Sequence, residues 1–227
     1  MATQLGLDLP ARTALGRDDF MVAPSNAIAL SMIDRSCTWP LYKLVLSGPE
    51  GSGKTHLTHV WAAARQARII AAHALTPDMV DDLATGPVAI EDVPDIRTDD
   101  VAQTALFHLH NLLQSAQMPL LMTGAPAPSH WRMSLPDLQS RIDAAGHAAL
   151  EAPDDSLLAA VLGKLFNDRQ VTPRPDVIPY LVTHMERSFD AAGLIVAALD
   201  SASLARKKPV TRSLAAELLD IATSNKG

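Results

Sequence analysis

Short apolar runs alternate with segments of helical character along the first two thirds of the chain. Five runs have the length and composition of buried strands: 42–47, 68–72, 88–90, 120–122 and 147–150. Four intervening segments are predicted as helices from their periodicity or their start signals: 54–67, 76–84, 99–115 and 134–141. A further helix is expected before the first strand, with Ser25 as a candidate N-cap. Strands that alternate with helices predict a parallel sheet covered by helices, which is the α/β class.

The pattern changes near residue 152, and no later segment has the character of a strand. After a helix start at 153–156, four segments have helical periodicity: 156–168, 176–186, 189–205 and 212–223. We therefore predict an α/β domain over residues 17–152, followed by a small all-α domain over residues 153–227. Residues 1–16 are predicted to form a flexible tail.

The segment between the first strand and the next helix carries a glycine-rich motif. Its fixed positions satisfy G-x-x-x-x-G-K-[ST], the phosphate-binding loop: Gly48, Gly53, Lys54 and Thr55. Gly51 and Gly53 allow backbone conformations in which successive N–H groups face one concavity. Lys54 is then expected to reach the β- and γ-phosphates, and the Thr55 hydroxyl to bind Mg²⁺. A glycine-rich turn without a ligand is the alternative, and the strand before and helix after the motif count against it.

Polar side chains follow two other predicted strands. Glu91 and Asp92 end the run that starts at Val88, and Thr123 follows the run 120–122. Beside a phosphate loop, one carboxylate would hold Mg²⁺ while the other orients the attacking water. Solvated acids at a strand end are the alternative interpretation. Thr123 is equally well explained as a sensor of the γ-phosphate or as a strand cap.

Composition and charge narrow the class of protein. The chain has 227 residues, 48% of them hydrophobic, and a net charge of −6, which argues against a DNA-coating protein but leaves a local basic patch open. The basic run 206–208 with Arg212 is interpreted as a solvated turn rather than a nucleic-acid patch. The single Cys37 excludes an internal disulfide and suits a reducing compartment. Without a membrane-length apolar run or a signal peptide, we expect a cytoplasmic protein with no membrane partner.

The tail contains a peptide with alternating leucines. Gln4 precedes Leu5, Leu7 and Leu9, and an extended backbone would place the three leucines on one side. Such a peptide could enter an apolar groove on a partner protein. An ordinary frayed terminus is the alternative, and the pattern alone does not exclude it.

Several segments together resemble the DnaA-related family of AAA+ ATPases. The similar segments are the loop region 48–59, Asp19-Phe20-Met21-Val22 with Ser25-Asn26, Phe107-His108 with Asn111, Ser140-Arg141-Ile142, and Met185-Glu186-Arg187-Ser188. The resemblance spans about residues 18–222. It implies a AAA+ P-loop core with a parallel sheet, followed by a helical lid, and a bound ATP or ADP with Mg²⁺.

The resemblance also implies roles for individual residues. Those expected to bind the nucleotide are Phe20, Val22, Asn26, Pro49, Glu50, Gly51, Ser52, Gly53, Lys54, Thr55, His56 and Arg187. Those expected to take part in catalysis are Glu91, Asp92, Thr123 and Arg141, with Thr55 and Glu91 holding Mg²⁺ through the nucleotide. Arg187 would reach the nucleotide from the lid. Arg141 would face the γ-phosphate of a neighbouring subunit, as an arginine finger does.

Within the family, the layout is similar to that of the Hda-type regulators. The peptide 4–9 resembles a sliding-clamp binding motif, the segment 135–138 is Hda-like, and the family's helix-turn-helix domain does not follow the lid in this sequence. The resemblance implies a regulator that binds the DNA polymerase sliding clamp and stimulates ATP hydrolysis by the initiator DnaA, which inactivates it. It also implies a homo- or hetero-oligomer formed through the AAA+ interface, and direct DNA binding is not expected.

Two departures from the family pattern affect the expected activity. The longer acid, Glu91, comes first in the acidic pair, and Ala125 and Pro126 stand where the family often has an Asp and an Arg. Both changes favour a nucleotide-holding regulator with weak ATPase activity of its own. Two alternatives are a DnaA-like initiator or helicase loader that acts directly on DNA or a helicase, and an autonomous metabolic ATPase.

Overall fold

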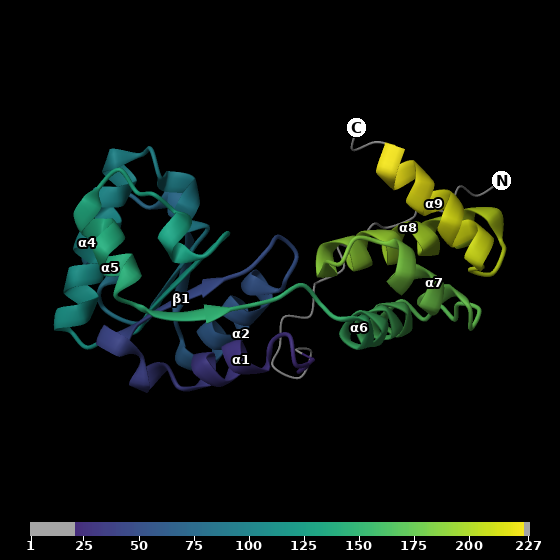
Figure 1. The fold of residues 1–227 in the computed structure, drawn as a ribbon, viewed down its shortest axis with the longest axis horizontal. Helices are drawn as coiled ribbons and strands as arrows, with labels where there is room; N and C mark the ends of the chain where they lie inside the picture. Colours follow the sequence, from purple (N-terminus) through teal and green to yellow (C-terminus); the bar gives the residue numbers. More distant parts are fainter. Residues whose placement is uncertain (1–20, 225–227) are drawn as a thin grey trace, which may run out of the picture.

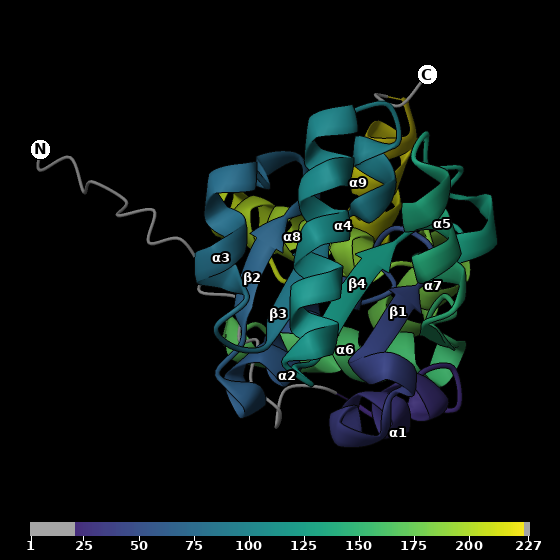
Figure 2. The same ribbon diagram turned by 90° about the vertical axis from the view of Figure 1, so that its left-hand side faces the viewer.

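A five-stranded parallel sheet forms the centre of the N-terminal part of the protein. In the computed structural model, which describes residues 21–224, the strands are β1 (Lys43–Ser47), β2 (Arg68–Ala71), β3 (Val88–Glu91), β4 (Leu120–Gly124) and β5 (Gly146–Ala149). Their order is β2-β3-β4-β1-β5, and every neighbouring pair is parallel. Figure 2 shows β2, β3, β4 and β1 side by side behind α4. All carboxyl ends therefore meet at one edge of the sheet.

Helices cover both faces of the sheet. They are α1 (Ala27–Asp34), α2 (Lys54–Arg65), α3 (Val80–Leu83), α4 (Asp100–Ser115) and α5 (Pro136–Asp143). Short 3-10 turns occur at Ser36–Thr38, Pro40–Tyr42, Ala72–Ala74, Pro77–Met79, Val93–Ile96 and Pro128–His130. Figure 1 shows α1 and α2 on one side of the sheet and α4 and α5 on the other.

Each face of the sheet has its own apolar core, because side chains alternate along a strand. Val45 of β1 faces the α4 side, where Leu106 and Leu109 are fully buried. Leu44 of β1 faces the opposite side and packs in the cluster that contains Trp61 of α2. The runs of buried residues in β1, β3 and β4 are typical of strands covered on both faces.

The remaining helices form a separate bundle. They are α6 (Asp155–Asp168), α7 (Val177–His184), α8 (Phe189–Arg206) and α9 (Arg212–Ser224). Their apolar faces make a third core that includes Leu158, Phe166, Leu181, Val196 and Leu199. Figure 1 shows this bundle, which we call the lid, beside the sheet and connected to it by the segment after β5. The predicted fold class, a parallel α/β core followed by helices, is confirmed.

The start of α1 differs from the prediction. Asn26, not Ser25, is the residue that precedes the first helical turn, and it makes no side-chain cap bond. Its Oδ1 accepts a hydrogen bond from the Ala23 N–H at 2.9 Å, and its Nδ2 donates to the Met21 carbonyl at 2.8 Å. The Asn26 side chain therefore braces the turn that enters the helix. No helix within residues 21–224 is long and apolar enough to cross a membrane.

Two basic groups lie in the core between α4 and the sheet. Lys43, the first residue of β1, and His110 of α4 are both fully buried. The Lys43 Nζ donates a hydrogen bond to the Met118 carbonyl at 3.2 Å, and burial lowers its pKa to about 8. Burial, together with the nearby charges of Lys43 and Arg141, lowers the pKa of His110 to about 4. His110 is therefore neutral in the folded protein at neutral pH.

We predict that His110 makes the protein less stable in mild acid. The unfolded chain binds a proton at this histidine below its ordinary pKa of 6.5, whereas the folded chain binds it only near pH 4. Between pH 7 and pH 5 this difference lowers the free energy of unfolding by on the order of 2 kcal/mol. Urea denaturation of the His110→Leu variant at both pH values should show a correspondingly weaker pH dependence.

The neighbouring histidine provides the matched control. His108 lies on the same helix but is exposed, so His108→Leu controls for the loss of a surface imidazole from α4. Equal pH dependence in the His110→Leu variant and the unaltered protein would show that the buried imidazole is not responsible.

Candidate functional site

The glycine-rich loop joins β1 to α2 at the carboxyl edge of the sheet. Gly51 and Gly53 have φ angles of +66° and +93°, and α2 begins at Lys54. These left-handed conformations strain any residue with a Cβ atom. Gly48 is restricted by space, since a Cβ atom there would lie 2.7 Å from the Ser52 Oγ. The loop therefore requires all three glycines, and its backbone precedes a helix N-terminus, where anions are favoured.

The Lys54 side chain lies over this loop. Its Nζ donates hydrogen bonds to the Gly48 carbonyl at 2.8 Å and to the Pro49 carbonyl at 2.9 Å. Burial lowers the Lys54 pKa, and the negative charges of Asp92, Glu50, Asp190 and Glu91 oppose this effect. An ammonium group is thus held at the mouth of the loop, with carboxylates on several sides.

Glu91, at the end of β3, is positioned close to α2. The Thr55 side chain forms a hydrogen bond with its carboxylate, while burial raises the Glu91 pKa. The second oxygen, Oε1, is buried and has no hydrogen-bond partner among the described residues. A buried carboxylate oxygen with unused acceptor capacity beside a hydroxyl is a donor set that suits a hard cation such as Mg²⁺.

A protein-only metal site is not present in the described part of the chain. Within residues 21–224 no three His, Cys, Asp or Glu side chains are grouped as metal ligands. Mg²⁺ commonly takes one or two protein ligands and completes its shell with phosphate oxygens and waters. Thr55 and Glu91 fit this second arrangement.

Thr123 connects β4 to the acidic turn after β3. Its hydroxyl is buried and accepts a hydrogen bond from the Asp92 N–H at 3.2 Å. Asp92 has a φ angle of +55°, an uncommon conformation for a residue with a side chain. Thr123 thus stabilises the backbone turn that carries the two acids, while the Asp92 side chain is exposed.

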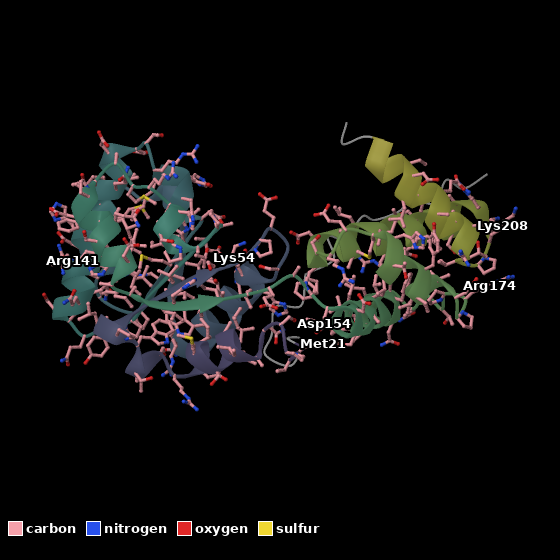
Figure 3. The ribbon with its side chains drawn as sticks, in the orientation of Figure 1. Met21, Lys54, Arg141, Asp154, Arg174 and Lys208 are labelled. Atoms are coloured by element: carbon pink, nitrogen blue, oxygen red, sulfur yellow. The ribbon has the colours of Figure 1, made fainter. Side chains whose placement is uncertain are left out.

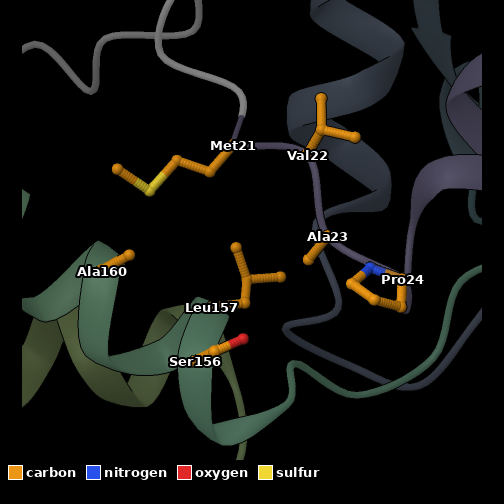
Figure 4. Close-up of a pocket in the computed structure, with 7 residues that line it drawn as sticks. All are labelled: Met21, Val22, Ala23, Pro24, Ser156, Leu157 and Ala160. Carbon is orange, nitrogen blue, oxygen red and sulfur yellow. The ribbon is translucent and has the colours of Figure 1, made fainter.

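A cavity lies between the segment before α1 and the first turns of α6. Its volume is about 390 Å³, and it is lined by Met21, Val22, Ala23, Pro24, Ser156, Leu157 and Ala160. Figure 4 shows these side chains on the two sides of the cavity. The lining is mostly apolar, and Asn26 braces the segment that forms one wall. Phe20, predicted to contribute here, lies outside the described residues.

The lid touches the glycine-rich loop directly. The Phe189 N–H, at the start of α8, donates a hydrogen bond to the Gly51 carbonyl at 2.8 Å. A Cβ atom on Gly51 would lie 2.4 Å from the Ser188 Cβ, and one on Gly53 would lie 3.1 Å from the Phe189 ring. The sequence did not predict this contact. The local signal near this contact is Ser188, the N-cap of α8, whose hydroxyl oxygen accepts a hydrogen bond from the Ala191 N–H.

The two predicted arginines lie in different surroundings. Arg187 forms an ion pair with Asp155 and donates a hydrogen bond to the Pro153 carbonyl at 3.3 Å, so its guanidinium lies at the start of α6. Arg141 is exposed on α5. Figure 3 shows Arg141 at the end of the molecule away from the lid, with Lys54 between them. Arg141 is therefore remote from the loop of its own chain.

The other predicted nucleotide-binding residues surround the loop. Pro49 and Glu50 are exposed, whereas Ser52 is buried, and its Oγ has no hydrogen-bond partner among residues 21–224. His56 is half-buried in the first turn of α2. The structure thus brings together the loop, the acidic turn and Thr123, and it adds Phe189 and Asp190 from the lid. Gln4, Leu5, Leu7 and Leu9 lie outside the described residues.

The fold is similar to those of the replication initiation protein DnaA and of a Holliday junction branch migration motor. No family model matches the chain. Domain III of the Thermotoga maritima replication initiation protein DnaA is 20% identical, with a TM-score of 0.81 over 93% of this chain and 98% of that one. AMPPCP-bound DnaA from Aquifex aeolicus is 16% identical, with a TM-score of 0.68 over 80% of this chain and 63% of that one.

A further similar structure is the Thermotoga maritima RuvB Holliday junction branch migration motor. It is 17% identical, with a TM-score of 0.69 over 91% of this chain and 71% of that one. At such identities the likeness establishes the fold. The chain therefore has the fold of DnaA domain III, a five-stranded parallel sheet covered by helices and followed by further helical segments.

We predict that Gly51→Ala weakens the contact between loop and lid. Alanine in a left-handed conformation costs about 1–2 kcal/mol, and its Cβ atom would also collide with Ser188. The free energy of unfolding should fall by at least about 1 kcal/mol, measured by urea denaturation. Gly86→Ala is the control, because a Cβ atom at Gly86 meets nothing within 4 Å. Equal stability of both variants would contradict the prediction.

Proposed function

We propose that the protein binds ATP or ADP between the glycine-rich loop and the lid. The observation that carries the proposal is the loop itself, with left-handed Gly51 and Gly53, Lys54 over its mouth, and the Glu91 carboxylate beside Thr55. Backbone N–H groups at a helix start and a nearby ammonium suit the β- and γ-phosphates. The likeness to DnaA structures that contain AMPPCP supports a nucleotide as the ligand.

Mg²⁺ would be held by Thr55 and Glu91 together with phosphate oxygens. The cation would neutralise charge that develops on the transferred phosphoryl group. Asp92 would orient water, and Thr123 would keep the acidic turn in place through the Asp92 N–H. The longer acid, Glu91, comes first in the acidic pair, and Ala125 and Pro126 follow β4. For these reasons we propose weak ATPase activity for the chain alone.

The purine base would occupy the cavity formed by Met21–Pro24 and the start of α6. Its volume of about 390 Å³ and its apolar lining suit a planar heterocycle. Val22 lines the cavity, and Asn26 braces the backbone that forms its wall. For Arg187 to reach the phosphates, its ion pair with Asp155 has to open.

We further propose that the protein regulates replication initiation by acting on a partner. Arg141 is exposed and remote from its own loop, which is the position from which an arginine finger serves another subunit. Such a group accelerates phosphoryl transfer by a factor of about 10³–10⁵. We propose that the partner is ATP-bound DnaA, which shares the fold, and that this protein acts as an Hda-type inactivator in the cytoplasm.

The peptide 4–9 would hold the protein on the DNA polymerase sliding clamp. The support is the alternation of Leu5, Leu7 and Leu9 after Gln4, together with the family resemblance. The proposed assembly is a hetero-oligomer formed through the AAA+ interface, with the clamp as a tether.

We predict that Lys54→Ala weakens ADP and ATP binding by at least about 100-fold, because a charge-assisted contact to phosphate is lost in a partly buried site. Titration calorimetry with both nucleotides in the presence of Mg²⁺ measures the change. Arg97→Ala, which removes an exposed positive charge outside the loop, should bind normally. If the unaltered protein produces neither heat nor thermal protection with either nucleotide, the proposed function fails.

We predict that Arg141→Ala abolishes the stimulation of ATP hydrolysis by DnaA but leaves clamp binding intact. Replacing Leu5, Leu7 and Leu9 by alanine should do the reverse in a clamp pull-down. Phosphate release from DnaA and capture on immobilised clamp are the two measurements. Arg132→Asn, which removes an exposed arginine near α5, is the control for Arg141.

Each outcome tests one part of the proposal. Unchanged stimulation by Arg141→Ala would exclude the arginine finger, and unchanged capture after loss of the leucines would exclude the tether. Stimulation of a helicase or tight clamp-independent DNA binding would instead favour an initiator-like or loader-like protein.

A further inference from the structure

Two loops lie side by side at the end of the lid. One follows α6 and contains Arg174, and the other follows α8 and contains Lys208. The Arg174 N–H donates a hydrogen bond to the Val210 carbonyl at 3.0 Å, which joins the loops. Figure 3 shows Arg174 and Lys208 together at the end of the lid farthest from the sheet. We call residues 169–175 and 206–213 the lid tip.

The lid tip carries a concentrated positive charge. Its six basic residues are Arg169, Arg174, Arg206, Lys207, Lys208 and Arg212, and the acidic residues Asp168 and Asp176 border its first segment. The whole chain, in contrast, has a net charge of −6. Arg174 and Lys207 are far apart in the sequence. The two loops therefore form a single basic patch only when the lid is folded.

Two of these cations have partners within the lid. Arg206 forms a bidentate ion pair with Glu217, with distances of 2.7 and 2.5 Å, and Arg212 lies 4.9 Å from the centre of the Tyr180 ring. The other four cations form no ion pair with residues 21–224: Arg169, Arg174, Lys207 and Lys208. Their charges remain available to an anionic partner.

The backbone of the second loop is fixed. Lys207 has a φ angle of +50°, and its N–H donates to the Leu204 carbonyl. The Lys208 N–H donates to the Ser203 carbonyl at 3.2 Å, and the Ser203 hydroxyl donates to the Lys208 carbonyl at 2.6 Å. Since the loop is already ordered, binding through it costs little additional backbone entropy.

We infer that the lid tip binds the phosphate backbone of duplex DNA without reading its sequence. Cations of two adjacent loops, joined by the hydrogen bond from Arg174 to Val210, suit a row of phosphates. A protein partner would require apolar anchors, and within the lid tip Val171 is half-buried and Val210 is buried, while the exposed Leu204 lies outside it on α8. The inference does not depend on the proposed action on DnaA. The inferred contact with DNA is weak, and the negative net charge of the whole chain gives no indication of it.

The experiment measures fluorescence anisotropy of two labelled duplexes of unrelated sequence with the full chain. Four phosphate contacts give a slope of about −3.6 for log K against log salt, which is about a 150-fold loss of affinity between 50 and 200 mM salt. The test positions are Arg174, Lys207 and Lys208. The variant Arg174→Ala, Lys207→Asn, Lys208→Ala should retain a slope of about −0.9 and lose most of its affinity at 50 mM salt.

A matched variant controls for net charge and for backbone conformation. It carries Arg35→Ala, Arg97→Ala and Arg132→Asn, all exposed on the α/β part, and Arg132, like Lys207, has a positive φ angle. Asparagine tolerates such a conformation better than alanine does. The control should bind both duplexes like the unaltered protein, and circular dichroism and ADP binding should show that both variants are folded.

Three results of the DNA measurements would overturn the inference. They are no DNA binding by the unaltered protein at 50 mM salt, an equal loss in both triple variants, and a preference for one duplex over the other. Leu204 is exposed on α8 beside the lid tip, so vesicles of anionic lipid form a separate arm. Binding to vesicles but not to DNA would also overturn it.

Discussion

The close approach of the lid to the glycine-rich loop constrains the rest of the structure. Gly51 has no space for a side chain because Ser188 lies against its Cα atom, and its carbonyl accepts a hydrogen bond from the first N–H of α8. The loop conformation and the position of α8 therefore depend on each other.

The order of the strands explains why the chemical groups meet where they do. β1 ends at the glycine-rich loop, β4 lies next to β1, and β3 lies next to β4. Thr123 and the acidic turn therefore lie at the same edge of the sheet as the loop. Thr123 then fixes the Asp92 backbone, while Thr55 of α2 fixes one oxygen of Glu91. A parallel sheet brings Thr55, the acidic turn and Thr123 together although these three segments are far apart in the sequence.

Local patterns predicted the elements well and their mutual contacts poorly. Apolar runs and start signals located the strands and most helices, and the glycine motif identified the loop, because both depend on neighbouring residues. Ser25 was the wrong N-cap, since Asn26 uses its side chain to hold the preceding turn. The contact of Phe189 with the loop and the pairing of Arg187 with Asp155 join distant segments, and no local periodicity encodes them.

The lid has a hydrophobic core of its own, whose members are not shared with the two clusters that flank the sheet. A rotation of the lid about the segment after β5 would break the polar and van der Waals contacts at the loop and the cavity wall. It would leave each of the three apolar clusters intact. If the bundle rotated as a rigid body about this segment, its outer end would be displaced farther than the residues that touch Gly51, because it lies farther from the segment.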